Sequence, residues 1–88
     1  MIKGKTKSGF EFEISKDIAN DYELVENLAE LEENPLLIGK IVNQVLGKEQ
    51  TARLKEHVRN EKGIVPTDKM TEEIIEIFQK GGEETKNS

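Results

Sequence analysis

The chain has 88 residues, no cysteine and a formal net charge of −5. A domain this small buries only about 60 to 65 per cent of the surface that its unfolded chain exposes, so we expect one domain of modest stability. The lack of cysteine excludes disulfide bonds and a Cys-based zinc site. No run approaches the roughly 20 apolar residues of a membrane span, and no apolar signal-peptide segment follows Met1. The sequence therefore predicts a soluble, unexported protein that contacts no membrane.

The charges are unevenly distributed along the chain. Residues 1–16 carry a net charge of +2, residues 17–47 of −6, residues 48–62 of +2 and residues 63–88 of −3. Proteins that bind nucleic acids concentrate Lys and Arg, because the neutralisation of phosphates drives the binding. Three glutamates dilute the only basic cluster, in residues 48–62. We therefore expect no nucleic-acid partner.

The first fourteen residues alternate with the two-residue period of β-strands. Gly9 can take the positive φ that a tight turn needs, and Phe10, Phe12 and Ile14 then alternate with glutamates. We expect the lysines of the first strand to face the glutamates of the second. An isolated two-stranded hairpin is marginal in water, so its apolar face must pack on helices.

Four segments after the hairpin have the apolar spacing of helices: residues 21–33, 35–46, 48–60 and 67–80. Asn20 or Asp21 can cap the first of them, Pro35 suits the first position of the second, and Gly47 ends that second helix. The remaining residues 81–88 are polar and rich in glycine, which predicts a flexible tail. The expected fold class is α+β, with an N-terminal hairpin packed on a small bundle of about four helices in a single domain of residues 1–80.

A run of seven acids extends from Asp17 to Glu33 without a Lys or Arg among them. On a helical wheel the glutamates of residues 21–33 gather on one face, which either is simply solvated or steers a basic partner. Their spacing is not that of a calcium-binding loop. His57 is the only histidine, and without cysteine or a nucleophile motif it predicts a structural or solvated side chain. We therefore expect no catalytic residue, no metal, no cofactor and no enzymatic activity.

The helix predicted over residues 35–46 is more apolar than a surface helix needs. Its large side chains cover roughly 180° of the wheel, against the stripe of about 100° that such a helix usually buries. Either this surplus is core, or one edge of the helix contacts another chain. The candidate partner-binding residues are Leu36, Leu37, Ile38, Ile41, Val42 and Val45. Leu36 falls on the polar side of the helix and is the best single candidate for an exposed contact.

Several segments together resemble a known family. Residues 8–14 (SGFEFEI), 21–24 (DYEL) and 32–37 (EENPLL) resemble, in this order, the small tail assembly chaperones of long-tailed bacteriophages and prophages. Residues 54–66 (LKEHVRNEKGIVP) and 72–78 (EEIIEIF) continue the likeness. It is a likeness of pattern that covers nearly the whole chain up to the tail, and it includes no catalytic signature.

The resemblance implies a role in tail assembly in the cytoplasm of a bacterial host. Chaperones of this family bind the tape measure protein, recruit tail tube subunits, which are copies of the major tail protein, and leave before the tail is finished. A frameshifted longer form often accompanies them, and association of the chain with itself stays open. A second reading is a small acidic inhibitor or regulator from a mobile element, which binds a host protein by charge mimicry. Its support is the acid run between Asp17 and Glu33.

Overall fold

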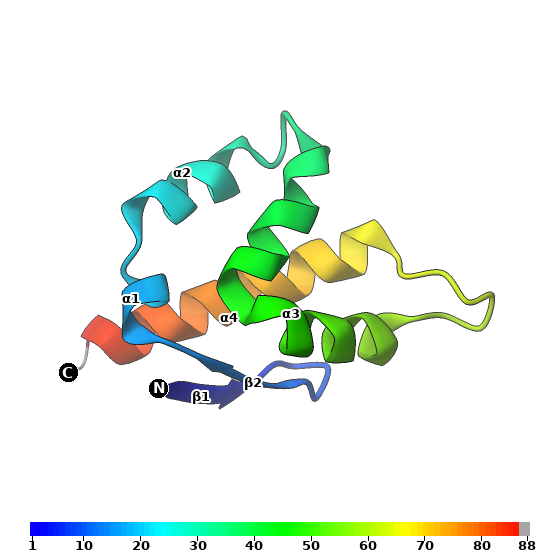
Figure 1. Cartoon of the computed structure of the whole chain (residues 1–88), viewed down its shortest axis with the longest axis horizontal. Coiled ribbons are helices and arrows are strands. Elements are labelled where there is room, and N and C mark those ends of the chain that lie inside the picture. The colour runs from blue at the N-terminus through cyan, green and yellow to red at the C-terminus, as the bar shows by residue number, and fades with distance from the viewer. Residues whose placement is uncertain (87–88) are drawn as a thin grey trace.

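The computed structural model describes the backbone of residues 1–86 and the side chains of residues 1–83. Over this range the elements are β1 (Ile2–Lys5), β2 (Glu11–Ile14), α1 (Lys16–Ala19), α2 (Tyr22–Glu30), the 3-10 turn η1 (Pro35–Leu37), α3 (Ile38–Val58) and α4 (Thr67–Lys86). Figure 1 shows the hairpin lying along one side of the helices, with α2 on the opposite side. The predicted α+β class, a hairpin packed against about four helices, is confirmed.

The two strands pair in the register that the sequence predicts. Lys3 lies opposite Glu13 and Lys5 lies opposite Glu11 in the antiparallel ladder. Gly9 takes a φ of 96° in the turn, a conformation that side chains disfavour. Each strand thus carries charges of one sign, and the pairing places opposite charges face to face.

The other face of the hairpin is part of the core. Phe10, Phe12 and Ile14 are all buried, and α3 and α4 contact the hairpin. Gly4 lies opposite Phe12, and a Cβ on Gly4 would lie 2.6 Å from Cζ of that ring. The Phe12 ring therefore occupies the space over Gly4.

Two short helices connect the hairpin to the rest of the chain. Ser15 caps α1 by accepting a hydrogen bond from the backbone N–H of Ile18, so residues 16–19, between the predicted hairpin and the first predicted helix, form one helical turn. Asp21 caps α2, because its carboxylate accepts from the N–H groups of Glu23 and Leu24. The helix ends at Glu30, three residues before the predicted end.

Helix α3 bends sharply at Gly47. This residue has φ 77° and ψ 170°, a conformation that is open almost only to glycine. The predicted break between two helices at Gly47 is thereby confirmed, although Pro35 begins a 3-10 turn rather than an α-helix. The bend sets the second half of α3 at an angle to the first (Figure 1).

Helix α4 is longer than the sequence predicts. It continues to Lys86, so residues 81–83 belong to α4 rather than to the predicted flexible tail, whereas residues 87–88 lie outside the described part of the chain. Helix α4 continues past Lys80 because it packs closely at Gly81, where an added Cβ would lie 2.6 Å from Ile14 Cδ1 and 3.3 Å from Ala19 Cβ. The glycine that suggests a tail is instead the point at which α4 packs against β2 and α1.

The core is formed by every element from the hairpin to α4. Its most completely buried side chains are Ile14, Leu24, Ile41, Val42, Leu54, Ile74 and Ile77. Between residues 1 and 86, no helix combines the length and the apolar composition that crossing a bilayer requires.

Candidate functional site

The candidate partner-binding residues at the start of α3 remain accessible. Leu36 in η1 is 89% exposed, the highest value among the large apolar side chains described. Leu37 and Ile38 beside it are half-buried and pack against the core. The prediction that Leu36 is exposed is confirmed. These three residues follow the acidic α2 and form an apolar corner that we call the η1 corner.

The other three candidates are core residues. Ile41 is completely buried, Val42 is 1% exposed and Val45 is 4% exposed. The prediction that they are available to a partner is wrong for this fold, because α2, α4 and β2 all pack against α3. A partner could contact little of these side chains unless the domain opened. The wide apolar surface of the helix is therefore mostly core.

A hollow of about 470 Å³ lies inside the bend of α3. Its apolar lining comes from the first half of α3, the second half of α3, the link before α4 and the start of α4: Ile38, Val42, Ala52, Val65 and Met70. Lys48 and Lys55 also line it, and among the described residues no acid does. We call this hollow the α3 groove. Its volume falls within the range of about 300 to 1,000 Å³ that is usual for ligand sites.

The α3 groove is absent from the sequence-based predictions because four separate segments form it. The bend at Gly47 brings the second half of α3 beside the first, and α4 then closes one side. The sequence does contain one signal, which is Gly47 itself. That residue predicts a break in the helix but not the direction of the bend.

Helix α2 presents an exposed surface of mixed character. Leu24 on its inner side is completely buried, whereas Tyr22 is 72% exposed and Val25 is 45% exposed. Glu23 and Glu30 are also exposed, and no α2 carboxylate takes part in a salt bridge within the described residues. This α2 face combines unpaired negative charge with accessible apolar side chains.

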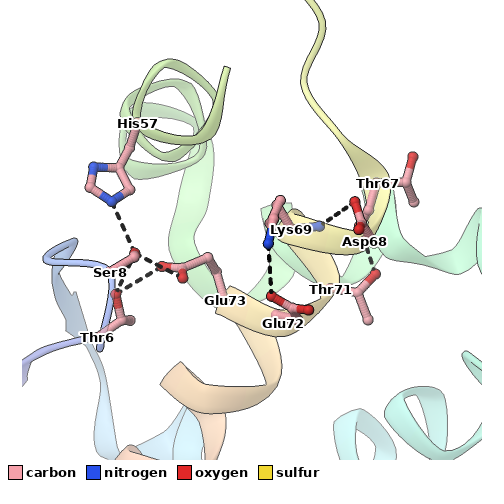
Figure 2. Close-up of polar contacts among 9 residues, drawn as sticks. All are labelled: Thr6, Ser8, His57, Thr67, Asp68, Lys69, Thr71, Glu72 and Glu73. Carbon is pink, nitrogen blue, oxygen red and sulfur yellow. Dashed lines mark hydrogen bonds and ion pairs between the residues drawn. The ribbon is translucent and has the colours of Figure 1, made fainter. Parts of the chain in front are cut away.

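A network of polar side chains joins the hairpin turn to α3 and α4 (Figure 2). Glu73 of α4 is only 7% exposed, and its two carboxylate oxygens accept from Thr6 Oγ1 at 2.8 Å and from Ser8 Oγ at 2.9 Å. The Nε2 atom of His57, on α3, lies 3.0 Å from Ser8 Oγ. We call these four residues the Glu73 network. Its members lie up to 67 positions apart in the sequence, so no local pattern predicts it.

The directions of these hydrogen bonds decide what the Glu73 network can do. A serine hydroxyl has one proton, and Ser8 donates it to Glu73. His57 must then donate from Nε2 to Ser8 Oγ, so it does not take the proton that an activated serine nucleophile gives up. The network satisfies a buried carboxylate and holds the turn against α4, which agrees with the structural role predicted for His57.

The residues that the structure describes contain no group of three or more His, Asp or Glu side chains placed to hold a metal ion. Comparisons of the chain with protein family models, with curated proteins and with solved structures found no significant match. The surfaces of this chain that bear on function are the η1 corner, the α3 groove and the α2 face.

Proposed function

We propose that the chain is a tail assembly chaperone of a long-tailed bacteriophage or prophage. It would bind the tape measure protein and recruit tail tube subunits in the cytoplasm of the bacterial host. The sequence pattern of residues 8–14, 21–24 and 32–37 supports this proposal by its resemblance to that family. The last of these segments contains Leu36 and Leu37 of the η1 corner, so one stretch of sequence carries both the likeness and most of the exposed apolar surface.

The exposure of Leu36 is the structural observation that carries the proposal. A leucine that is 89% exposed leaves nearly all its apolar surface in water, and its neighbours Leu37 and Ile38 extend that surface. Exposed apolar patches of this kind mark sites of contact with other proteins. A long helical client offers many apolar stripes, so many weak contacts along it would give avidity without tight individual sites.

Co-expression with the tape measure protein of the same genetic element tests the proposal. We expect the chain to raise the soluble fraction of that protein and to elute with it in size-exclusion chromatography. Leu36→Asp should abolish both effects while the thermal unfolding midpoint of the chaperone stays unchanged, because the side chain has almost no contacts to lose. Ile41→Asp is unsuitable as a test, since it places a charge in the core.

Ile64→Asp is the matched control. Ile64 is also exposed, at 56%, but it lies in the link between α3 and α4. This variant should keep the client in solution as well as the unaltered chain does. An unchanged solubility of the tape measure protein, with no complex on the column, would refute the chaperone proposal.

The α2 face supports a second candidate function. Its carboxylates are exposed and have no cationic partner within the described residues, as charge mimicry of a host protein's ligand requires. An inhibitor of this kind should lose its activity when Glu23, Glu26 and Glu30 are replaced by lysine, and should be indifferent to Leu36→Asp. A chaperone should show the reverse pattern in the solubility assay.

A further inference from the structure

We propose that the outer edge of β1 binds an extended segment of another protein in which every second residue is acidic. The segment would add a third strand to the two-stranded sheet, a mode of recognition known as β-augmentation. We call the backbone N–H and C=O groups of Lys3 and Lys5, together with these two side chains, the β1 edge. The proposal does not depend on the chaperone function.

The register of the hairpin shows which backbone groups of β1 point away from β2. The ladder ends with Lys5 opposite Glu11, and one pair further on the Thr6 N–H donates to the Phe10 carbonyl at 2.9 Å. In an antiparallel ladder, hydrogen-bonded pairs alternate with pairs whose N–H and C=O groups point outward. The N–H and C=O groups of Lys3 and Lys5 therefore point outward, along the side of β1 that faces away from β2.

The structure fills other outward-pointing positions of the hairpin and leaves this one open. On the far side of β2, Gln50 bonds with both backbone groups of Glu13. Next to the turn, the outward-pointing N–H of Lys7 donates to Glu76 Oε2 of α4 at 2.8 Å. Within the described residues, the four backbone groups of the β1 edge have no hydrogen-bond partner. An open edge of this kind offers its hydrogen bonds to a further strand.

The side chains of the β1 edge favour an acidic strand. Lys3 and Lys5 are exposed, and neither belongs to a salt bridge within the described residues. Across the ladder, β2 already places Glu13 opposite Lys3 and Glu11 opposite Lys5. A strand on the outer side would meet the same two lysines, about 6.8 Å apart, so acids two residues apart can face both.

A hollow beside β1 leaves space at this edge. It has a volume of about 230 Å³, and its lining includes Lys3, Gly4 and Lys5 of the strand and Lys80 and Glu83 of α4. Lys80 is partly exposed and adds a third positive charge, against the single negative charge of Glu83. The described part of the hollow therefore has a net positive charge, which complements an acidic segment.

A second copy of this chain does not fit the β1 edge. The outward-pointing residues of β1 are lysines, so pairing of two β1 strands would place lysine opposite lysine. Strand β2 has glutamates, but Gln50 already occupies the outward-pointing groups of Glu13. The occupant that the charges and the backbone favour is thus an acidic strand of a different protein.

A nuclear magnetic resonance titration of the full chain, labelled with ¹⁵N, tests the proposal. The probe is an acetylated and amidated peptide of the sequence Thr-Glu-Val-Glu-Val-Glu-Thr. We expect the largest amide shifts at Lys3 and Lys5, with a Kd of about 0.1 to 1 mM because so short a strand makes few contacts. The same peptide with lysine at each glutamate position should not bind, because like charges would then face each other.

Methylation of the peptide backbone separates strand pairing from attraction between charges. A methyl group on the nitrogen of the central glutamate removes an N–H that faces the β1 edge, and it should weaken binding by about tenfold. A methyl group on the nitrogen of a valine removes an N–H that points away from β1, and it should change the affinity by less than about twofold. The two methylated peptides have the same charge and composition, so they are matched controls.

Variants of the protein locate the site. Lys3→Thr with Lys5→Thr removes both charges but keeps residues that suit a strand, and it should weaken binding of the unmethylated acidic peptide by about tenfold. Lys40→Thr with Lys62→Thr removes two exposed lysines elsewhere and should leave the affinity unchanged. Circular dichroism checks that each variant is folded. If the first variant does not fold, the methylated peptides still decide, because they are tested on the unaltered chain.

Three results would overturn the proposal. One is the absence of shifts at the Lys3 and Lys5 amides at the highest peptide concentration. Another is an equal affinity of the two methylated peptides, which would show attraction between charges without strand pairing. The third is a single-stranded oligothymidylate that shifts the same amides at a lower concentration than the acidic peptide does, which would show that the lysines bind phosphates.

Discussion

The side-chain amide of Gln50 pairs with both backbone polar groups of Glu13. Gln50 Oε1 accepts from the Glu13 N–H at 2.7 Å, and Gln50 Nε2 donates to the Glu13 carbonyl at 2.7 Å. The side chain thus makes the pair of bonds that a neighbouring strand would make along the free edge of β2. It ends the two-stranded sheet by occupying part of the edge that another strand could extend.

Gln50→Ala should lower the free energy of unfolding by about 1 to 2 kcal/mol, because two backbone groups of a half-buried residue lose their partners. Urea unfolding measures this change. Gln50→Glu should be no better, since a carboxylate cannot donate to the Glu13 carbonyl. Gln44→Ala is the control on the same helix, where the side chain is exposed and little change is expected. Equal stabilities for the two alanine variants would contradict the role given to Gln50.

Removal of the buried carboxylate at the hairpin turn should destabilise the domain. In Glu73→Ala, the hydroxyls of Thr6 and Ser8 lose their shared acceptor, and we expect a loss of about 1 to 3 kcal/mol in thermal or urea unfolding. Glu72→Ala, one residue earlier, should change stability by at most about 0.5 kcal/mol. The Glu72 carboxylate is exposed, and its ion pair with Lys69 Nζ is long, at 3.8 Å. If the two variants were equally stable, the Glu73 network would not contribute to the stability of the domain.

Two adjacent glycines of α4 should respond to alanine with opposite sign. Gly81→Ala places a methyl group against Ile14 and Ala19, which should destabilise the domain by about 1 to 2 kcal/mol. Gly82→Ala meets no atom within 4 Å in the described structure and should stabilise the helix by about 0.5 to 1 kcal/mol. Differential scanning calorimetry of the pair is the measurement. A stabilising Gly81→Ala would show that α4 ends before this contact.

Substitution at the bend of α3 should be unfavourable whatever the size of the new side chain. A Cβ on Gly47 meets no atom within 4 Å, so the penalty comes only from the backbone conformation, and we expect about 1 to 3 kcal/mol for Gly47→Ala. Gly47→Asn should give no relief, because its ψ of 170° lies outside the left-handed helical region that asparagine tolerates. Gly39→Ala, on the first half of α3, should be neutral or stabilising by comparison. The urea unfolding midpoints of the three variants measure these differences in stability.

The hairpin and the break at Gly47 are predictable from sequence because their signals are local. Alternation of side chains fixes which strand positions face the core, and a glycine needed at positive φ marks the turn at Gly9 and the bend at Gly47. The helix caps are local for the same reason, as Asp21 illustrates.

The sequence-based predictions that are wrong concern residues whose environment depends on distant segments. A helical wheel cannot tell that α2, β2 and α4 pack on α3 and that Ile41 and Val45 are buried, so core residues are indistinguishable from a binding surface. Composition cannot tell that Gly81 touches Ile14, 67 positions earlier, and it therefore predicts a tail where the helix continues. The α3 groove is unpredictable in the same way, since it exists only after the bend and α4 are in place.

The contact between the first strands and α4 has a consequence for biosynthesis. The hairpin leaves the ribosome before α4, but Glu73 and Gly81, which hold its turn and contact Ile14, follow only with that helix. Because a hairpin is marginal by itself and α4 packs on β1 and on Ile14, the apolar face of the hairpin is not fully covered until α4 has been translated. The domain therefore closes only after α4 has been synthesised, and a product truncated before α4 would be prone to aggregation and proteolysis.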